Sequence, residues 1–199
     1  MTATIFMKLL LISLLLSILI SNIPQKEYKN WITIQDKETW IGYTETNFPW
    51  CKAKRTFNNT IDEILPIIED VNNYYKIFDS LVYSKKDSND IVHIKADYPL
   101  PLSDRDYVVK FKRLFDGKDI IYRFHSIKDP NQHIDKNYVR LVNAQGEWRL
   151  SSIDNELTEV SYTWNGELGG NIFDWILKKA WLKQGNEIMN NLNNILYYK

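Results

Sequence analysis

The chain ends in a one-sided apolar pattern, GGNIFDWILKKAWLKQGNEIMNNLNNILYYK at residues 169–199. The apolar positions follow one another at steps of three or four, which places them on one face of an α-helix. This stripe consists of Phe173, Leu177, Trp181, Gly185, Ile188, Leu192 and Ile195. At about 1.5 Å per residue the helix is about 40 Å long, more than a small sheet needs to close its core. We therefore expect it to cover a cavity.

The middle of the chain reads as strands separated by turn-like breaks. In segments 105–115 and 157–165, apolar and polar side chains alternate, which is typical of a strand with one buried face. Further segments of this kind lie at 31–34, 40–46, 51–57, 80–85, 90–96, 119–127, 138–144 and 147–153. We predict an antiparallel meander, with a bulge at Gly146 that bends a long strand.

Two helices complete the predicted architecture. Thr60 and Glu63 form a capping-box pattern, which predicts a short helix that runs to about Asp70. A curved antiparallel sheet with one early helix and one long terminal helix is an α+β helix-grip fold, in which the sheet wraps around the terminal helix. Where the two surfaces do not meet, the gap between them is a hydrophobic tunnel.

Composition excludes several classes of function. The 199 residues include 25 Lys and Arg and 25 Asp and Glu, so no net charge attracts the chain to nucleic acid. Aromatic residues make up 14% of the chain; they either fill a core or line a ligand pocket. One domain is expected at this length.

Cysteine and histidine give no pattern that indicates a metal or a catalytic centre. The single cysteine, Cys51, rules out an internal disulfide. His93, His125 and His133 lie on separate segments without metal-ligand spacing. No nucleophile elbow or phosphate-binding glycine loop occurs. We predict no metal, no cofactor and no enzymatic activity.

The amino terminus carries an export signal. Lys8 precedes a largely apolar run at residues 9–20, and a polar exit follows at residues 21–24. Residues 1–24 are therefore expected to be a signal peptide or an N-terminal membrane anchor, and residues 25–199 the folded domain. Both alternatives place the domain outside the cytoplasm: periplasmic, secreted, or anchored to the cell envelope.

Several short motifs in a fixed order carry a resemblance to a known family. They are PLSDRDY at 101–107, VR at 139–140 followed by GEW at 146–148, VSY at 160–162, and GGNI at 169–172 with Trp175 in the helix. From about Trp31 to Leu196 the chain resembles the START lipid-transfer family of the Bet v 1-like helix-grip superfamily. It departs from the family at Phe173, where proline is common. The positions that hold an ion pair in sterol carriers of the family correspond here to Ile94 and Phe111.

The resemblance implies non-enzymatic binding, and transfer, of a lipid or other hydrophobic ligand in the tunnel. Such a protein is expected to be a monomer that contacts a membrane transiently. Loops 96–104 and 165–171 are the segments expected to move for ligand release. Two alternatives stay open. One is a cyclase or aromatase-like enzyme of the same superfamily, and the other is a structural or interaction module whose own aromatic side chains fill the cavity.

The ligand-facing residues are expected on the inner side of each strand and on the helix stripe. Three have a second interpretation: Arg105 in a structural ion pair, Asn143 bonded to neighbouring backbone, and Gly185 as a close backbone approach. The expected ligand-binding residues are Ile94, Arg105, Tyr107, Val109, Phe111, Tyr122, Phe124, Leu141, Asn143, Trp148, Tyr162, Trp164, Phe173, Leu177, Trp181, Gly185 and Ile188.

Overall fold

The computed structural model describes residues 23–46, 49–98, 103–128, 135–165 and 174–198. Within them a ten-stranded sheet has the order β1-β2-β3-β10-β9-β7-β6-β5-β4. One strand, β8, lies outside this path and pairs in parallel with β6. All other pairings are antiparallel. The strands are β1 Ile32–Asp36, β2 Trp40–Tyr43, β3 Trp50–Phe57, β4 Leu81–Lys86, β5 Ile91–Ala96, β6 Arg105–Asp116, β7 Asp119–Ser126, β8 Val139–Arg140, β9 Gln145–Ser152 and β10 Thr158–Asn165.

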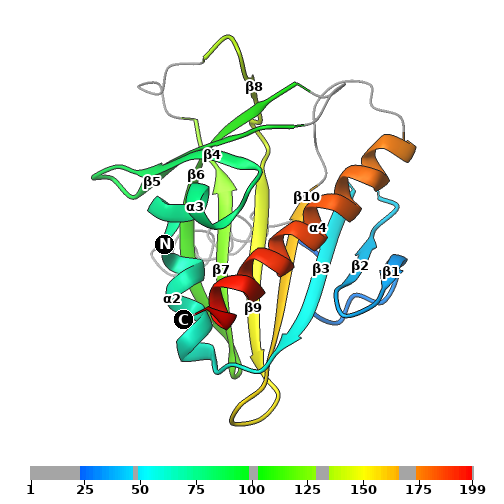
Figure 1. The fold of residues 1–199 in the computed structure, drawn as a ribbon. Helices are drawn as coiled ribbons and strands as arrows, with labels where there is room; N and C mark the ends of the chain where they lie inside the picture. The colour runs from blue at the N-terminus through cyan, green and yellow to red at the C-terminus, as the bar shows by residue number, and fades with distance from the viewer. Residues whose placement is uncertain (1–22, 47–48, 99–102, 129–134, 166–173, 199) are drawn as a thin grey trace, which may run out of the picture.

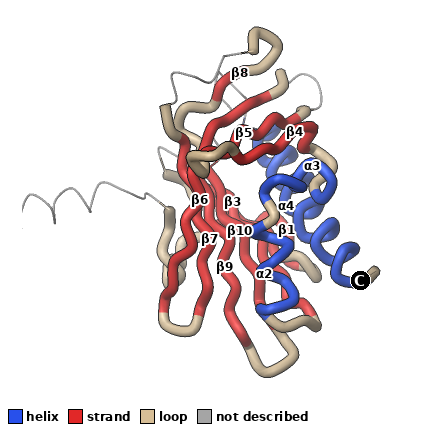
Figure 2. The backbone as a smooth tube through the Cα atoms, turned by 90° about the vertical axis from the view of Figure 1, so that its left-hand side faces the viewer, coloured by secondary structure: helices blue, strands red, loops and turns tan. Residues whose placement is uncertain are grey.

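The helices all lie on one side of this sheet (Figure 2). They are α2 Ile61–Glu69, the 3₁₀ turn η1 Val71–Asn73, α3 Tyr74–Ile77 and the long α4 Asp174–Tyr197. Figure 1 shows α4 running diagonally across β9, β10 and β3, with α2 and α3 beyond its carboxyl end. The α+β helix-grip architecture predicted from the sequence is confirmed.

The early helix begins where its capping residues place it. Thr60 is the N-cap of α2, and the Glu63 carboxylate accepts a hydrogen bond of 2.7 Å from the Thr60 backbone N–H. This reciprocal contact satisfies donors that the first helical turn leaves unpaired. The buried residues of α2 then pack onto the sheet, among them Ile64 and Ile68, which are fully buried.

Two predictions about the segment 138–153 are wrong. Only Val139–Arg140 form a strand in the first half of it, and residues 141–144 are irregular. Gly146 is not a bulge, because it pairs in regular register with Trp164 on one side and Phe124 on the other. A Cβ at this position would lie 2.5 Å from Cε1 of Phe124. The glycine is needed to make room for this ring.

A buried carboxylate on the outer face fastens β8 to the sheet. Asp106 is fully buried, and Arg140 donates hydrogen bonds to both of its oxygens, at 2.8 Å to Oδ1 and 2.6 Å to Oδ2. His93 Nε2 lies 2.9 Å from the same Oδ2. Burial raises the pKa of Asp106, but the bonds with Arg140 and His93 outweigh burial and hold this pKa below its ordinary value.

We predict that unfolding free energy falls when the pH drops below about 4. A depressed folded-state pKa stabilises the protein above the unfolded-state value, about 3.9 for Asp, and this stabilisation is lost as the pH falls through the folded-state value. Urea titrations from pH 7 to pH 3 measure the effect. Asp106→Asn should be less stable at pH 7 and show a flatter pH dependence, whereas Asp97→Asn, at an exposed position, should match the unchanged protein. Equal slopes for all three would contradict the assignment.

Candidate functional site

The inner face of the sheet carries a layer of aromatic rings beneath α4. The closest pair is Trp148 on β9 and Tyr162 on β10, whose ring centroids are 4.5 Å apart. Phe111 on β6 stacks on Tyr122 of β7 at 4.8 Å. Phe78, next to α3, stacks on Trp148 at 5.9 Å from the helical side. Rings from the sheet and from the helical side therefore meet between the sheet and the helices.

Two small hollows remain within this aromatic layer, each about 40 Å³ in volume. The first lies toward α3 and the second toward the amino-terminal half of α4. The first is lined by Tyr74, Phe78, Ser80, Leu81, Ile94, Tyr107, Phe111, Phe124, Trp148, Tyr162, Gln184 and Ile188. The second is lined by Tyr98, Tyr107, Phe124, Leu141, Ala144, Gln145, Tyr162, Trp164, Asn165, Ala180, Trp181 and Gln184.

Four side chains separate the two hollows: Tyr107, Phe124, Tyr162 and Gln184 line both. We call these four residues the partition. Small-molecule sites in proteins usually enclose about 300–1,000 Å³, so neither hollow alone holds more than a few water molecules. A larger ligand requires the partition side chains to change rotamer, which joins the hollows.

The hollows are uncharged but not wholly apolar. Among the described residues that line them there is no Asp, Glu, Lys or Arg. Burial raises the pKa of Tyr107 and of Tyr162 above the ordinary value, so both keep their hydroxyl protons at neutral pH. Tyr98 forms a side-chain hydrogen bond with Gln184. The chemistry available is therefore hydrogen bonding from neutral groups.

Trp181 contributes an unused donor beside the second hollow. Its side chain is 3% exposed, and its indole nitrogen has no hydrogen-bond partner within the described part of the chain. A buried N–H without an acceptor costs free energy. A ligand with a carbonyl or hydroxyl oxygen in this region is suited to accept that bond.

Most of the residues expected to face a ligand lie around these hollows. The structure places ten of them there: Ile94, Tyr107, Phe111, Phe124, Leu141, Trp148, Tyr162, Trp164, Trp181 and Ile188. Leu177 lines a separate, more open hollow with Trp181 and Tyr43. Phe173 and most of the two expected release loops lie outside the described residues. Ligand contact itself stays a prediction for every one of these residues.

Four residues from the strands and loops lie away from both hollows. Val109 is fully buried in the core, and Tyr122 packs on Phe111 at the far side of the first hollow. Asn143 is exposed, because residues 141–144 do not form the strand that was to turn it inward. Arg105 is buried, with its guanidinium 5.6 Å from the ring centroid of Tyr98. Its guanidinium donates a hydrogen bond to the Ser103 carbonyl, and the ion pair expected for Arg105 stays a prediction.

Sequence reasoning missed the lining supplied by α3 and its neighbours and by Gln184. A four-residue helix such as α3 leaves no periodic signal, so Tyr74 and Phe78 went unassigned. Gln184 follows Trp181 by three positions and precedes Ile188 by four, which places it on the same helix face. Its position was predictable from the spacing, but the stripe was defined by apolar residues and did not include it.

At Gly185 the α4 backbone comes close to the sheet, and this residue lines neither hollow. A Cβ at this position would lie 2.8 Å from Cδ1 of Ile41 and 3.2 Å from Cβ of Ala53. The backbone of α4 therefore rests directly on the side chains of Ile41 in β2 and Ala53 in β3 at this point. Of the two interpretations given to Gly185 above, the close backbone approach is the one that the structure supports.

Gly185→Leu is predicted to lower the unfolding free energy by about 3 kcal/mol, because the added side chain must lift α4 from the sheet. Lys183→Leu, at an exposed position of the same helix, is the control and should change stability little. Chemical denaturation of both variants measures the difference. An unaltered midpoint for Gly185→Leu would show that the helix does not rest on the sheet at this residue.

Comparison of the fold with solved structures finds close matches along the whole body of the chain. The STAR-related lipid transfer protein of Xanthomonas axonopodis matches with a TM-score of 0.73 over 85% of this chain and 99% of its own, at 19% identity. The chain has the START-like helix-grip fold. Human StAR-related lipid transfer protein 5 matches with a TM-score of 0.71 over 99% and 98% of the two chains, at 12% identity.

The START-like fold also occurs in a protein of a different class. The Zhui aromatase/cyclase of a Streptomyces species matches with a TM-score of 0.51 over 76% of this chain and 94% of its own, at 14% identity. No family model and no curated protein sequence matches this chain. Identities this low establish the START-like fold, and function has to be argued from the residues of this chain.

Proposed function

We propose that this protein binds a hydrophobic ligand, a lipid, between the inner face of the sheet and α4, and transfers it between membranes. The observation that carries the proposal is the uncharged aromatic lining of the two hollows, with hydrogen-bonding groups at the partition and at Trp181. Such a lining suits a ligand that is mostly hydrocarbon with one neutral polar group. The folds of the two lipid transfer proteins above support this proposal by analogy.

Ligand entry requires the protein to rearrange. The partition must rotate before the two hollows join, and rotation disturbs stacked rings such as Tyr162 on Trp164, at 5.1 Å. Each buried CH₂ of a ligand contributes about 0.8 kcal/mol, so a chain of several CH₂ groups offsets the loss of ring contacts worth about 0.5–1.5 kcal/mol each. Long acyl chains or sterols are favoured over small hydrophobic molecules for this reason.

A second candidate is favoured by one specific observation, the volume of about 40 Å³ in each hollow. If the partition side chains do not move, the aromatic rings are simply a core, and the domain is a structural or interaction module.

The enzymatic alternative finds less support among the described residues. A cyclase-like mechanism needs a group inside the cavity that can exchange a proton near neutral pH, which Tyr107 and Tyr162 with their raised pKa values do not provide. His125 is exposed, and Arg123 pairs with Glu147 at 3.0 Å on the outer face. Neither residue is available to a ligand beneath α4.

Export is part of the proposal. Residues 1–22 lie outside the described residues, and the signal peptide or anchor remains our inference from their sequence. Among the residues that the structure describes, no helix is both long and apolar enough to cross a bilayer. Mass measurement of the protein from membrane and soluble fractions distinguishes a cleaved leader from a retained one.

Native mass spectrometry of the full chain, purified in a mild uncharged detergent, tests ligand binding. We predict a bound lipid in the unchanged protein. Ala180→Trp should reduce the bound fraction at least about tenfold, because Ala180 borders the second hollow and the added indole fills a space of this size. Lys179→Trp is the matched control, since Lys179 is the exposed neighbour on the same helix.

A third variant separates the two candidate functions. Phe124→Ala removes a partition ring and joins the hollows, at a cost of about 3–5 kcal/mol in stability. If the unchanged protein and Phe124→Ala both carry no lipid and take up none from fluorescent analogues, the module is the correct assignment. Equal lipid occupancy in Ala180→Trp and Lys179→Trp would exclude this cavity as the binding site.

A further inference from the structure

A separate hollow lies on the opposite, outer face of the sheet. The segment 23–31 crosses this face before β1 begins. At one end Lys26 forms an ion pair of 2.7 Å with Asp119, the first residue of β7. At the other end Trp31 meets Trp40 of β2 edge to face, at a centroid distance of 6.3 Å. The segment thus forms a wall above the outward-facing side chains of the sheet.

The floor of this outer hollow comes from three neighbouring strands. Register places Lys54 of β3 opposite Ser161 of β10, and Ser161 opposite Arg149 of β9. Alternation along each strand turns these side chains away from α4, since Ala53 and Val160 face the core. The outer hollow is partly open to solvent, and its volume of about 390 Å³ lies in the range of small-molecule sites and far exceeds that of either inner hollow.

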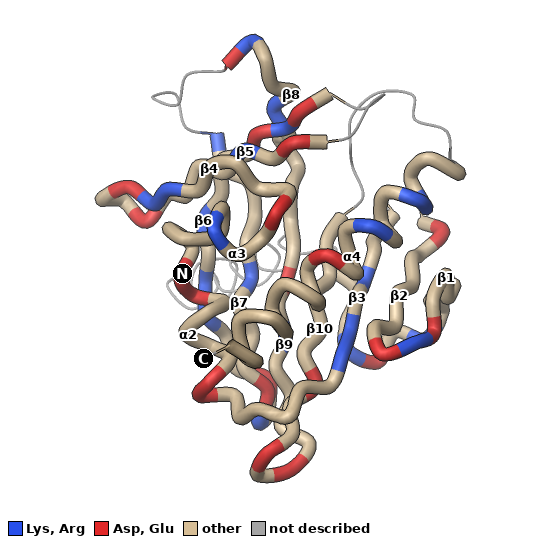
Figure 3. Tube along the Cα trace, viewed as in Figure 1, with Lys and Arg blue, Asp and Glu red and all other residues tan. Residues whose placement is uncertain are grey.

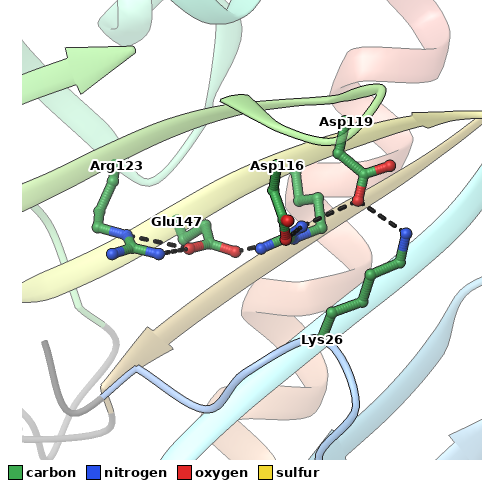
Figure 4. Close-up of polar contacts among 6 residues, drawn as sticks. Lys26, Asp116, Asp119, Arg123 and Glu147 are labelled. Carbon is green, nitrogen blue, oxygen red and sulfur yellow. Dashed lines mark hydrogen bonds and ion pairs between the residues drawn. The ribbon is translucent and has the colours of Figure 1, made fainter. Parts of the chain in front are cut away.

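Much of the charge around the outer hollow is already paired. Figure 4 shows the network: Arg149 contacts Asp116 at 2.8 Å and Asp119 at 2.9 Å, and Glu147 joins Arg149 to Arg123. Lys54 lies 3.6 Å from Glu159. Five basic and two acidic residues line the hollow, and basic residues recur along β3 (Figure 3). Within the described part of the chain, no carboxylate lies within 4.0 Å of the two remaining lining cations, Lys29 and Lys52.

Lys52 is the more buried of these two cations. Its Nζ lies 4.5 Å from the ring centroid of Trp31, and among the described residues no carboxylate lies within 4.0 Å of it. Burial lowers the pKa of Lys52 to about 8, and although Glu147 and Glu159 act against this, Arg149 and Lys54 add to it. A half-buried ammonium with no carboxylate in direct contact is unfavourable, so an anion bound in the hollow would stabilise it.

The remaining lining narrows the class of anion. Ser151, Ser161 and Thr33 provide hydroxyl groups beside the ammonium groups. Several donors around a compact cation suit an anion with more than two acceptor oxygens. The rings of Trp31 and Trp40 form an apolar wall that accommodates an organic substituent. A phosphate ester has both properties.

We propose that the outer hollow is a second binding site, for the anionic group of a phosphate ester, with Lys52 as its central contact and Lys29 at its rim. It lies across the sheet from the cavity beneath α4 and does not depend on ligand binding there. The phosphate ester is either a soluble metabolite or the head group of a membrane lipid, because both present the same anion to the hollow.

Calorimetric titration of the full chain in an uncharged detergent tests the proposal. The probes are glycerol 3-phosphate, glycerophosphoglycerol, and dihexanoyl phosphatidylglycerol below its micelle concentration. We expect binding of at least one probe, weakened about tenfold or more in Lys52→Met, which loses one charge-assisted contact. Lys52→Arg should retain binding. Lys85→Met makes the same change at an exposed position of β4, far from the hollow, and should bind as the unchanged protein does.

The pH dependence provides an independent measurement on the same site. Phosphodiester probes keep a constant charge from pH 6 to pH 10, so loss of affinity above about pH 8 reports the ammonium of Lys52. In Lys52→Arg the loss should be absent, since arginine stays protonated. Thermal melting of each variant verifies that it is folded, and Lys29→Met, at an exposed rim position, should weaken binding without altering stability.

Each outcome has a defined meaning. Binding of the two chain-free probes identifies a soluble phosphate ester, and binding of only the short-chain lipid identifies a lipid head group, provided that both depend on Lys52. If no probe binds, or if Lys52→Met binds as tightly as Lys85→Met, the proposal is wrong. Lipid binding that Ala180→Trp abolishes and Lys52→Met leaves intact would belong to the cavity beneath α4.

Discussion

The contact between the α4 backbone and the sheet at Gly185 is the constraint on which the inner cavity depends. Ile41 and Ala53 set how near the helix can come. Polar contacts on its flanks keep it there: Asn186 with Gln35 of β1 at 2.8 Å, and Glu187 with the backbone N–H of Ser80 at 2.7 Å. Held close over β2 and β3, α4 leaves a wedge of space over the centre of the sheet, and aromatic rings occupy it.

Both candidate sites follow from one alternation of side chains. On β9 and β10, Trp148 and Tyr162 face α4, whereas Glu147 and Arg149 face outward. The inner face is therefore neutral and ring-filled, and the outer face is charged. A substitution on these strands affects one site or the other, because neighbouring residues point to opposite sides of a backbone layer that is fully hydrogen-bonded. The two sites can for this reason be examined separately.

The sequence predicted those parts of the fold in which a periodic pattern continues over many residues. The α4 stripe and strands such as 105–115 repeat often enough to define a face, so the α+β helix-grip architecture and half of the inner lining were predictable. Short elements were not: α3 spans four residues, and β8 only two. Gly146 was misread as a bulge because its reason is a ring on another strand, Phe124. The outer hollow depends on where the segment 23–31 crosses, and no local pattern specifies this path.

The partition has a kinetic consequence. If a ligand spans both hollows, it enters and leaves only while Tyr107, Phe124, Tyr162 and Gln184 are rotated aside. The barrier to exchange is then set by the rotation of these side chains and not by the hydrocarbon area that the ligand buries. Two ligands of equal affinity but different width would differ in residence time, so the partition selects by cross-section as well as by polarity. A carrier built in this way keeps its cargo for a period fixed by ring rotation.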